Sequence, residues 1–468
     1  MPKFTQSQNR FKSYLQTLGI NIMLFLGLKR NAMAQLEKAR QDSPEDYNLL
    51  LFTLQLHRNE ENWEEYLKLY AQFERFHTGE LLFNRNFGST LLNFGHYEEA
   101  AARLRYCVEN WNLDARHDFE QNVTLAQLAV CYINLGMLDA ASTTNQRVSE
   151  KKHWNADVIY AQLLFKIAAS QSGAIPDFLD EQIKKYPWLP CLYYWKGQYV
   201  HDYLHNSQSA YQLFKTALER TNYFRIRSDT LGNGFGGEFY ANIFSMLQSA
   251  VTAYMQFNKK SVYPILWLTC LTKLKTLDKF IDIPATRIYI LIEGDAPAKA
   301  EKMCQKALKK PLNKRTTDYL ALLALAQKKL GKLDEGVASA RQAVTLNYYN
   351  DEAWTILGDI QILQKDWDSA IHTHKEITKA NPYDFRAWKK LGICCVNTAD
   401  LASAQSAFEK AVQINPSEAD AWVDLGDVYA RLGNSSLAVS AYQNGLKYNW
   451  LEDQRRNHAS QEVEKMNS

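Results

Sequence analysis

Three segments in the C-terminal third of the chain align without gaps, each displaced by 34 residues from the one before. They read "EAWTILGDIQILQKDWDSAIHTHKEITKANP", "RAWKKLGICCVNTADLASAQSAFEKAVQINP" and "DAWVDLGDVYARLGNSSLAVSAYQNGLKYNW". A repeat of this length predicts that one small helical unit is stacked on copies of itself. The repeat-defining positions are occupied by Trp354, Gly358, Ala370, Pro382, Trp388, Gly392, Ala404, Phe408, Pro416, Trp422, Gly426, Tyr429 and Ala438.

Small and large residues are distributed within each segment as two antiparallel helices require. Glycine or alanine at repeat positions 8 and 20 lets the helices approach closely, and larger residues at positions 4, 7, 11 and 24 fill the remaining space. Proline at position 32 cannot continue a helix, so it ends the second one. A single unit leaves an apolar face uncovered, and the units must therefore stack.

The order W-x2-L-G-x2-Y, then A-x3-F, then P resembles the tetratricopeptide repeat (TPR) family. The resemblance implies an all-α, helix-turn-helix solenoid, a right-handed superhelix whose first helices line a concave groove. The register covers most of residues 13–452, with an irregular helical insertion. We expect an N-terminal TPR run at 13–155, degenerate units at 156–224, the insertion at 225–280, a C-terminal TPR run at 281–452 and a polar C-terminal tail at 453–468.

The insertion contains a glycine cluster, Gly232, Gly234 and Gly237, with the spacing G-x-G-x-x-G. A dinucleotide site needs a parallel sheet to aim such a loop and an acidic residue about 20 positions later. Between Glu238 and Asp278 there is no Asp or Glu, and the flanking helical repeats supply no sheet. We therefore expect a loop between helices and no bound nucleotide or other cofactor.

Two histidines, His201 and His205, have the i, i+4 spacing that would place both imidazoles on one helix face. A zinc protease would need Glu at 202 as general base and a third ligand, but position 202 is Asp. No order of nucleophile and base stands out among the ten histidines of the chain. We expect neither a metal site nor an enzyme.

An apolar segment near the N-terminus, residues 18–28, resembles a targeting sequence. Asn21 interrupts it, however, and Lys29 and Arg30 stand where a cleavage region is normally uncharged. The repeat register, projected back to 13–46, explains the same residues as a helix pair. We expect cytoplasmic residence, with export or membrane association through this segment as the alternative.

The resemblance implies that repeat positions 2, 5, 9 and 12 point into the groove. One TPR subgroup binds the C-terminal carboxylate of Hsp70 or Hsp90 with a clamp of Lys, Asn and Arg. The corresponding residues here, including Thr355, Lys390 and three aspartates, do not form that clamp. The groove is instead mixed and locally acidic, which suits a basic peptide or helix, unless its charges serve solubility only. Its candidate residues are Asp359, Arg386, Lys389, Asp420, Asp424 and Asp427.

A second candidate partner surface is an aromatic stretch in the degenerate units. Interfaces favour Tyr and Trp because each buries much area with few rotors, although several of these residues must also serve the core. The candidates are Trp188, Tyr193, Tyr194 and Tyr199.

Charge and composition narrow the function further. The net charge of +3, from 54 basic and 51 acidic residues, gives no electrostatic reason to expect nucleic acid. We expect a non-catalytic scaffold or adaptor that mediates protein–protein interactions within a complex. The alternatives are an assembly chaperone or regulator that binds a peptide-like or partly folded client transiently, and a subunit of a bacterial envelope or secretion assembly.

Overall fold

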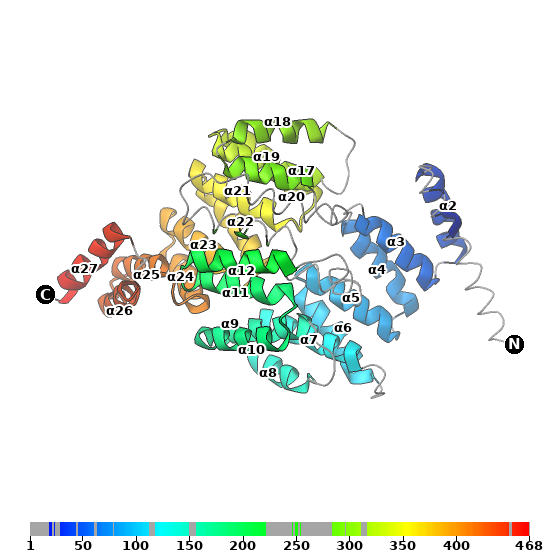
Figure 1. Ribbon diagram of the computed structural model, residues 1–468, viewed down its shortest axis with the longest axis horizontal. Helices are drawn as coiled ribbons and strands as arrows, with labels where there is room; N and C mark the ends of the chain where they lie inside the picture. Colours follow the sequence, from blue (N-terminus) through cyan, green and yellow to red (C-terminus); the bar gives the residue numbers. More distant parts are fainter. Residues whose placement is uncertain are drawn as a thin grey trace. The chain divides into compact units, whose positions relative to one another are not determined.

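The structure is a computed structural model that describes residues 29–220 and 283–467, apart from short gaps, together with a few isolated helical residues (Figure 1). The described residues are helical and contain no strand. The glycine cluster and nearly all of the expected insertion lie outside them. The gaps are 44, 60–62, 78, 112–117, 149–155, 295, 310–315 and 449–451, and the isolated residues are 18–20, 23, 246, 249, 250 and 253.

The chain divides into two compact units, residues 1–87 with 311–316, and residues 88–310 with 317–468. The first unit contains α2 (Lys29–Asp42), α3 (Tyr47–Asn59), α4 (Trp63–His77) and the start of α5 (Leu81–Asn93). Its core is aromatic, and the rings of Tyr70 and Phe87 stack with centroids 4.6 Å apart. Ala32 and Ala39, small residues of the projected repeat, are buried in another cluster of this unit, with Leu36 and Leu49.

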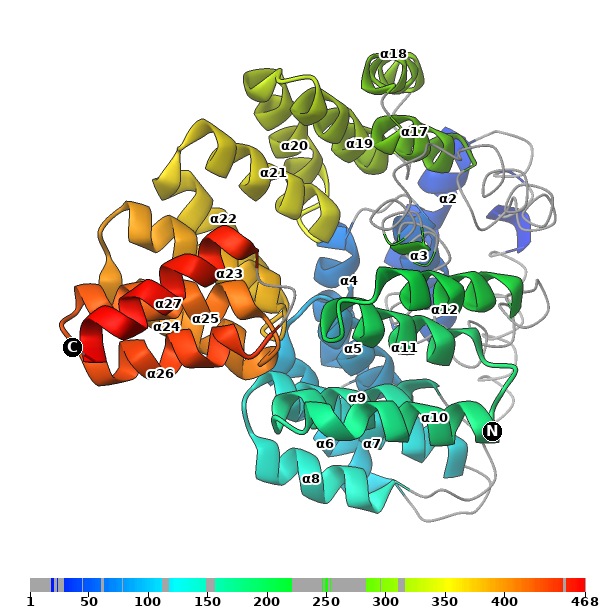
Figure 2. The same cartoon turned by 60° about the vertical axis from the view of Figure 1, so that its left-hand side comes forward.

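The second unit is a succession of helix pairs. From α20 to α27 each helix packs on the next, and Figure 2 shows α21 to α27 laid side by side. The helices are α6 (Tyr97–Asn110), α7 (Asp118–Asn134), α8 (Leu138–Arg147), α9 (Ala156–Ala168), α10 (Ile175–Lys185), α11 (Pro190–Asp202), α12 (Ser207–Arg220), α17 (Ile283–Glu293), α18 (Pro297–Leu308), α19 (Thr316–Lys329), α20 (Leu333–Leu346), α21 (Asp351–Gln364), α22 (Trp367–Ala380), α23 (Phe385–Asn397), α24 (Leu401–Ile414), α25 (Ala419–Arg431), α26 (Ser435–Leu446) and α27 (Asp453–Asn467).

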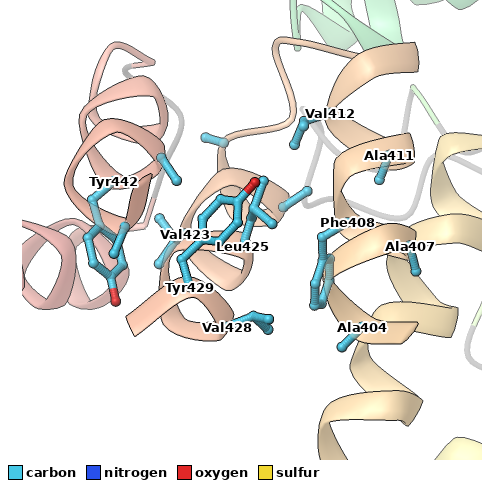
Figure 3. Packing of buried hydrophobic residues seen from close by; sticks show 14 of the residues in the cluster. Ala404, Ala407, Phe408, Ala411, Val412, Val423, Leu425, Val428, Tyr429 and Tyr442 are labelled. Carbon is cyan, nitrogen blue, oxygen red and sulfur yellow. The ribbon is translucent and has the colours of Figure 1, made fainter. Parts of the chain in front are cut away.

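Close approach within each pair depends on the repeat glycine. A Cβ at Gly426 would lie 2.5 Å from the ring of Tyr442, a distance that no side chain tolerates without movement. In the core cluster of α24–α26, Phe408 points from α24 toward α25, which carries Leu425 and Val428 (Figure 3). The missing Cβ on the first helix thus makes room for a large ring on the second.

The loops between repeats are also built alike. In each, the indole Nε1 of the repeat tryptophan donates to the carbonyl six residues earlier: Trp354 to Tyr348 at 2.6 Å, and Trp388 and Trp422 to their prolines at 2.8 Å. An asparagine at the start of each loop accepts from the amide two residues on. These two hydrogen bonds fix the path of the chain from one repeat to the next.

The C-terminal segment, expected as a polar tail, forms the helix α27, which packs on α25 and α26. Ala459 of α27 is fully buried, while most of the helix is polar. A terminal helix with a polar outer face covers the last apolar surface of a repeat array. Of the helices that can be described, none has both the length and the apolar character to cross a bilayer.

Candidate functional site

Charged side chains connect the first helices of successive C-terminal repeats. We call the surface made by α19, α21, α23, α25 and α27 the first-helix face. Near its start, Asp359 of α21 accepts from Lys328 of α19 at 2.6 Å and from Lys390 of α23. One carboxylate therefore bridges three helices.

The environment of Asp359 keeps it ionised. Burial alone would raise the pKa of this carboxyl, but the Lys390 and Lys328 ammonium groups outweigh that effect and hold the pKa below its usual value. Asp359 therefore stays negative at neutral pH, and its charge is used to join neighbouring repeats.

The same device recurs at the other end of the face. Asp424 of α25 accepts from Arg455 of α27 at 2.7 Å, and Asp420 forms an ion pair with the same guanidinium at 3.1 Å. Asp427 accepts from Tyr442 at 2.7 Å and lies 2.7 Å from His458 Nε2. The acidic cluster predicted from the sequence is thus faced by basic residues of the terminal helix.

Burial acts differently on the members of this cluster. It raises the pKa of Asp424, although the charge and hydrogen bond of Arg455 oppose the shift. Asp420 and Asp427 keep 45% and 40% of their side-chain surface in solvent. Those two carboxylates can therefore be reached by a partner.

A cleft of about 290 Å³ opens where α11 ends beside α23. In it, Asp202 forms an ion pair with Arg386, and Lys389 forms one with Glu418, the N-cap residue of α25. The Asp202 side chain is 90% buried, whereas that of Arg386 is 48% exposed. The remaining lining residues are His201, His205, Ser207, Phe385 and Lys390.

Asp202 is held as a carboxylate in this cleft. Burial would raise its pKa, but the hydrogen bond from His201 at 2.9 Å and the charge of Arg386 lower it overall. Helix α11 ends at Asp202, and His205 lies beyond it in a turn with a positive φ of 48°. The expectation that His201 and His205 share one helix face is therefore wrong. The described residues contain no group of three or more potential metal ligands.

The aromatic candidates lie around α11. Tyr193 is buried, and its hydroxyl donates to the carbonyl of Pro187 at 2.9 Å. Trp188, Tyr194 and Tyr199 are half-buried against the cluster formed by α9, α10 and α11. These three keep part of their surface accessible, and a partner contact through them stays a prediction.

The sequence analysis predicted six groove residues but not their ion-pair partners. Asp202, Glu418, Arg455 and His458 each complete an ion pair on the first-helix face or in its cleft. Arg455 and His458 could have been predicted from the sequence. Helix α27 begins 34 residues after α25, so it takes the place of the first helix of another repeat. Asp202 is far away in sequence and gave no such signal.

Comparison with known families matches residues 322–385 and 396–449 to a model described as tetratricopeptide repeat. Both of these segments are tetratricopeptide repeats. The predictions of this family and of an all-α TPR solenoid are confirmed. The matched segments contain the second half of α19 and all of α20, α21, α22, α24, α25 and α26.

Solved structures similar to this chain include several of MamA. One, "Crystal structure of MamA", is 21% identical and covers 39% of this chain and 99% of its own, with a TM-score of 0.33. MamA 41-end from Desulfovibrio magneticus RS-1 is 19% identical over 37% and 98%, with a TM-score of 0.33. YrrB, titled a TPR protein with an unusual peptide-binding site, is 18% identical over 45% and 98%, with a TM-score of 0.32. No curated protein sequence matches the chain.

Proposed function

We propose that this TPR protein is a non-catalytic scaffold or adaptor that binds a segment of a partner protein on the first-helix face and holds it within a multiprotein complex. The observation that carries the proposal is the continuity of that face. Each first helix from α19 to α27 contributes charged side chains that are fixed by ion pairs to a neighbouring helix. Side chains that are already fixed lose little conformational entropy when a partner binds. The entropic cost of binding on this face is therefore small.

The α25 end of the face has the chemistry for a basic segment. Asp420 and Asp427 are both partly exposed and lie on one helix, 7 residues apart, hence on one side of it. Their intrachain partners, Arg455 and His458, are themselves one-third to one-half exposed. A lysine or arginine of a partner helix could therefore replace these contacts without unfolding α27.

The fixed geometry favours a lasting complex over transient holding of a client. A chaperone for unfolded chains generally presents adaptable apolar surface, whereas this face is charged and its side chains are engaged with one another. Stable co-purification at a fixed stoichiometry supports the scaffold. Release of the bound protein by an unrelated peptide would support the client-binding alternative instead.

The experiment compares two double variants that remove the same charge. Asp420→Asn with Asp427→Asn alters the first-helix face, while Asp334→Asn with Asp368→Asn alters exposed positions in the first turns of the second helices α20 and α22. The partner that co-purifies with the tagged wild-type chain is then titrated against each. We expect affinity to fall by about tenfold for the first double variant only. Equal affinity for both variants would overturn the proposal.

A further inference from the structure

The loops between C-terminal repeats form an edge along the second unit. We call the loops 347–350, 381–384 and 415–418 the loop edge. Because each loop is fixed by its asparagine and tryptophan hydrogen bonds, its other side chains are held at a constant spacing of one repeat. A second helical run can therefore contact these loops at regular intervals.

The turns of the α6–α12 run meet this edge one after another. At the first loop, the ring of Tyr349 packs on Phe94 with centroids 4.2 Å apart, and its hydroxyl lies 3.3 Å from His96 Nε2. At the second loop, the Tyr383 hydroxyl donates to the carbonyl of Ile133 at 2.7 Å. Including the third loop described below, the turns α5–α6, α7–α8 and α11–α12 thus face three successive loops of the other run.

The third loop is the most deeply covered. Asn415 Nδ2 donates to the carbonyl of Asp202 at 3.1 Å, and the Tyr203 hydroxyl donates to the carbonyl of Ile414 at 3.1 Å. Asn415 is fully buried, whereas Asn381, its equivalent one repeat earlier, is exposed. Both loops share the hydrogen bond from the amide two residues on to the asparagine, and Asn415 in addition contacts the docked turn at Asp202.

The hydroxyl contacts share one chemical feature. Tyr97 donates to the carbonyl of Ala380, and the carbonyls of Ala380, Ile133 and Ile414 all belong to the last turn of a helix. The last carbonyls of a helix have no backbone N–H partner within the helix, and they lie at the negative end of the helix dipole. A neutral phenol satisfies such a carbonyl with no charge to desolvate, and burial raises the pKa of Tyr97 further from neutrality.

We propose that these contacts form an intrachain latch. In it, the α6–α12 run docks on the loop edge and the Asp202 carboxylate forms an ion pair with Arg386. Docking brings Asp202 and Arg386 together from positions far apart in the chain, and it places the end of α11 over the cleft on the first-helix face. Release of the latch frees Arg386 from its ion pair with Asp202 and uncovers the loop 415–418. The effect of that release on a partner rests on the proposed function, but the latch itself is tested without any partner.

Hydrogen–deuterium exchange of the full chain provides the test, because the two loops are matched internally. The amide of Ser417 donates to Asn415 and that of Tyr383 to Asn381 at similar distances, 3.1 and 3.3 Å. We expect amides of 415–418 to exchange roughly tenfold more slowly than those of 381–384, since only the former loop is buried by docking. Equal rates in the wild-type chain would overturn the latch.

A variant with Asp202→Asn, Tyr97→Phe, Tyr203→Phe and Tyr383→Phe should abolish that difference and increase the radius of gyration in small-angle scattering. The matched control is Tyr429→Phe, which removes a hydroxyl bonded to Glu409 within the C-terminal repeats and should leave the difference intact. Circular dichroism checks that the helices are retained. If the fourfold variant keeps its helices and 415–418 stays protected, the proposal is wrong; if it unfolds, the wild-type comparison decides.

Discussion

Gly392 lies against the ring of Phe408, so closely that a Cβ on the glycine would be 2.8 Å from two of the ring carbons. The two residues belong to the first and second helices of one repeat, and they set the distance between those helices. The same relationship holds for Gly358 with His374 and for Gly426 with Tyr442.

Gly392→Ala therefore has two opposing effects on the stability of the fold. Alanine stabilises a helix interior by about 1 kcal/mol relative to glycine, whereas overpacking a filled core costs about 1–3 kcal/mol. Since Phe408 is buried on all sides, we expect a net loss of stability, measured as a lower urea midpoint. Gly173→Ala is the control, because a Cβ there meets nothing within 4 Å. A rise in the midpoint for Gly392→Ala would contradict this packing.

A second prediction concerns pH and His374, which is 1% exposed and whose ring nitrogens have no hydrogen-bond partner among the described residues. Burial, aided by Lys390 and opposed by Asp359, lowers its pKa from 6.5 to about 4. Between these values the unfolded chain binds a proton that the folded chain does not. Stability should therefore decrease as pH falls from 6.5 to 4, by about 3 kcal/mol in total.

His374→Phe tests the origin of that dependence. Phe408 occupies the equivalent position one repeat later, and it packs on its glycine as His374 packs on Gly358. We expect the variant to be more stable than the wild type at pH 5 and to lose part of the acid sensitivity, as followed by hydrogen exchange in α21 and α22. An unchanged pH profile would show that His374 is protonated or hydrated in the folded protein.

The turns within repeats provide a reciprocal pair of substitutions. Ala399 and Gly433, one repeat apart, both have left-handed backbone, with φ of 61° and 81°. Alanine pays about 1 kcal/mol for this conformation and glycine does not. We expect Ala399→Gly to stabilise the chain and Gly433→Ala to destabilise it, each by up to about 1 kcal/mol in thermal or urea unfolding. Shifts in the same direction would refute the explanation.

A fourth prediction links the terminal helix to binding. Arg455→Met removes the guanidinium that pairs with Asp420 and Asp424 but keeps an apolar stem of similar length. The largely buried Asp424 then loses its ion-pair partner, which should lower stability. The exposed carboxylate of Asp420 becomes free, and a basic partner should bind several-fold more tightly. Lys465→Met, near the end of the same helix, is the control, and weaker binding of the Arg455 variant alone would contradict the assignment.

The repeat could be predicted from sequence because its defining residues encode contacts within 34 positions. Gly392 and Phe408 meet inside one unit, and Trp388 contacts the carbonyl six residues before it, so the spacing of these residues predicts their contacts. The ion pair of Asp202 with Arg386 could not be predicted, since it depends on how two distant runs dock. The glycine cluster that resembles a phosphate loop lies outside the described residues, and its interpretation as a loop between helices stays a prediction.

The histidine pair shows a local limit of the same reasoning. The spacing of His201 and His205 suits a helix, but α11 ends at Asp202 and the chain turns with a positive φ at His205. No glycine marks that turn. A helix end without its usual residue is difficult to locate from one sequence.

Cross-linking mass spectrometry of the native complex shows directly whether a partner binds the first-helix face. Lysines mark both sides of the same repeats: Lys389 and Lys390 lie on the first helix α23, whereas Lys375, Lys379 and Lys410 lie on the second helices α22 and α24. We predict that partner cross-links concentrate on Lys389 and Lys390. Cross-links confined to the second-helix lysines would contradict the account.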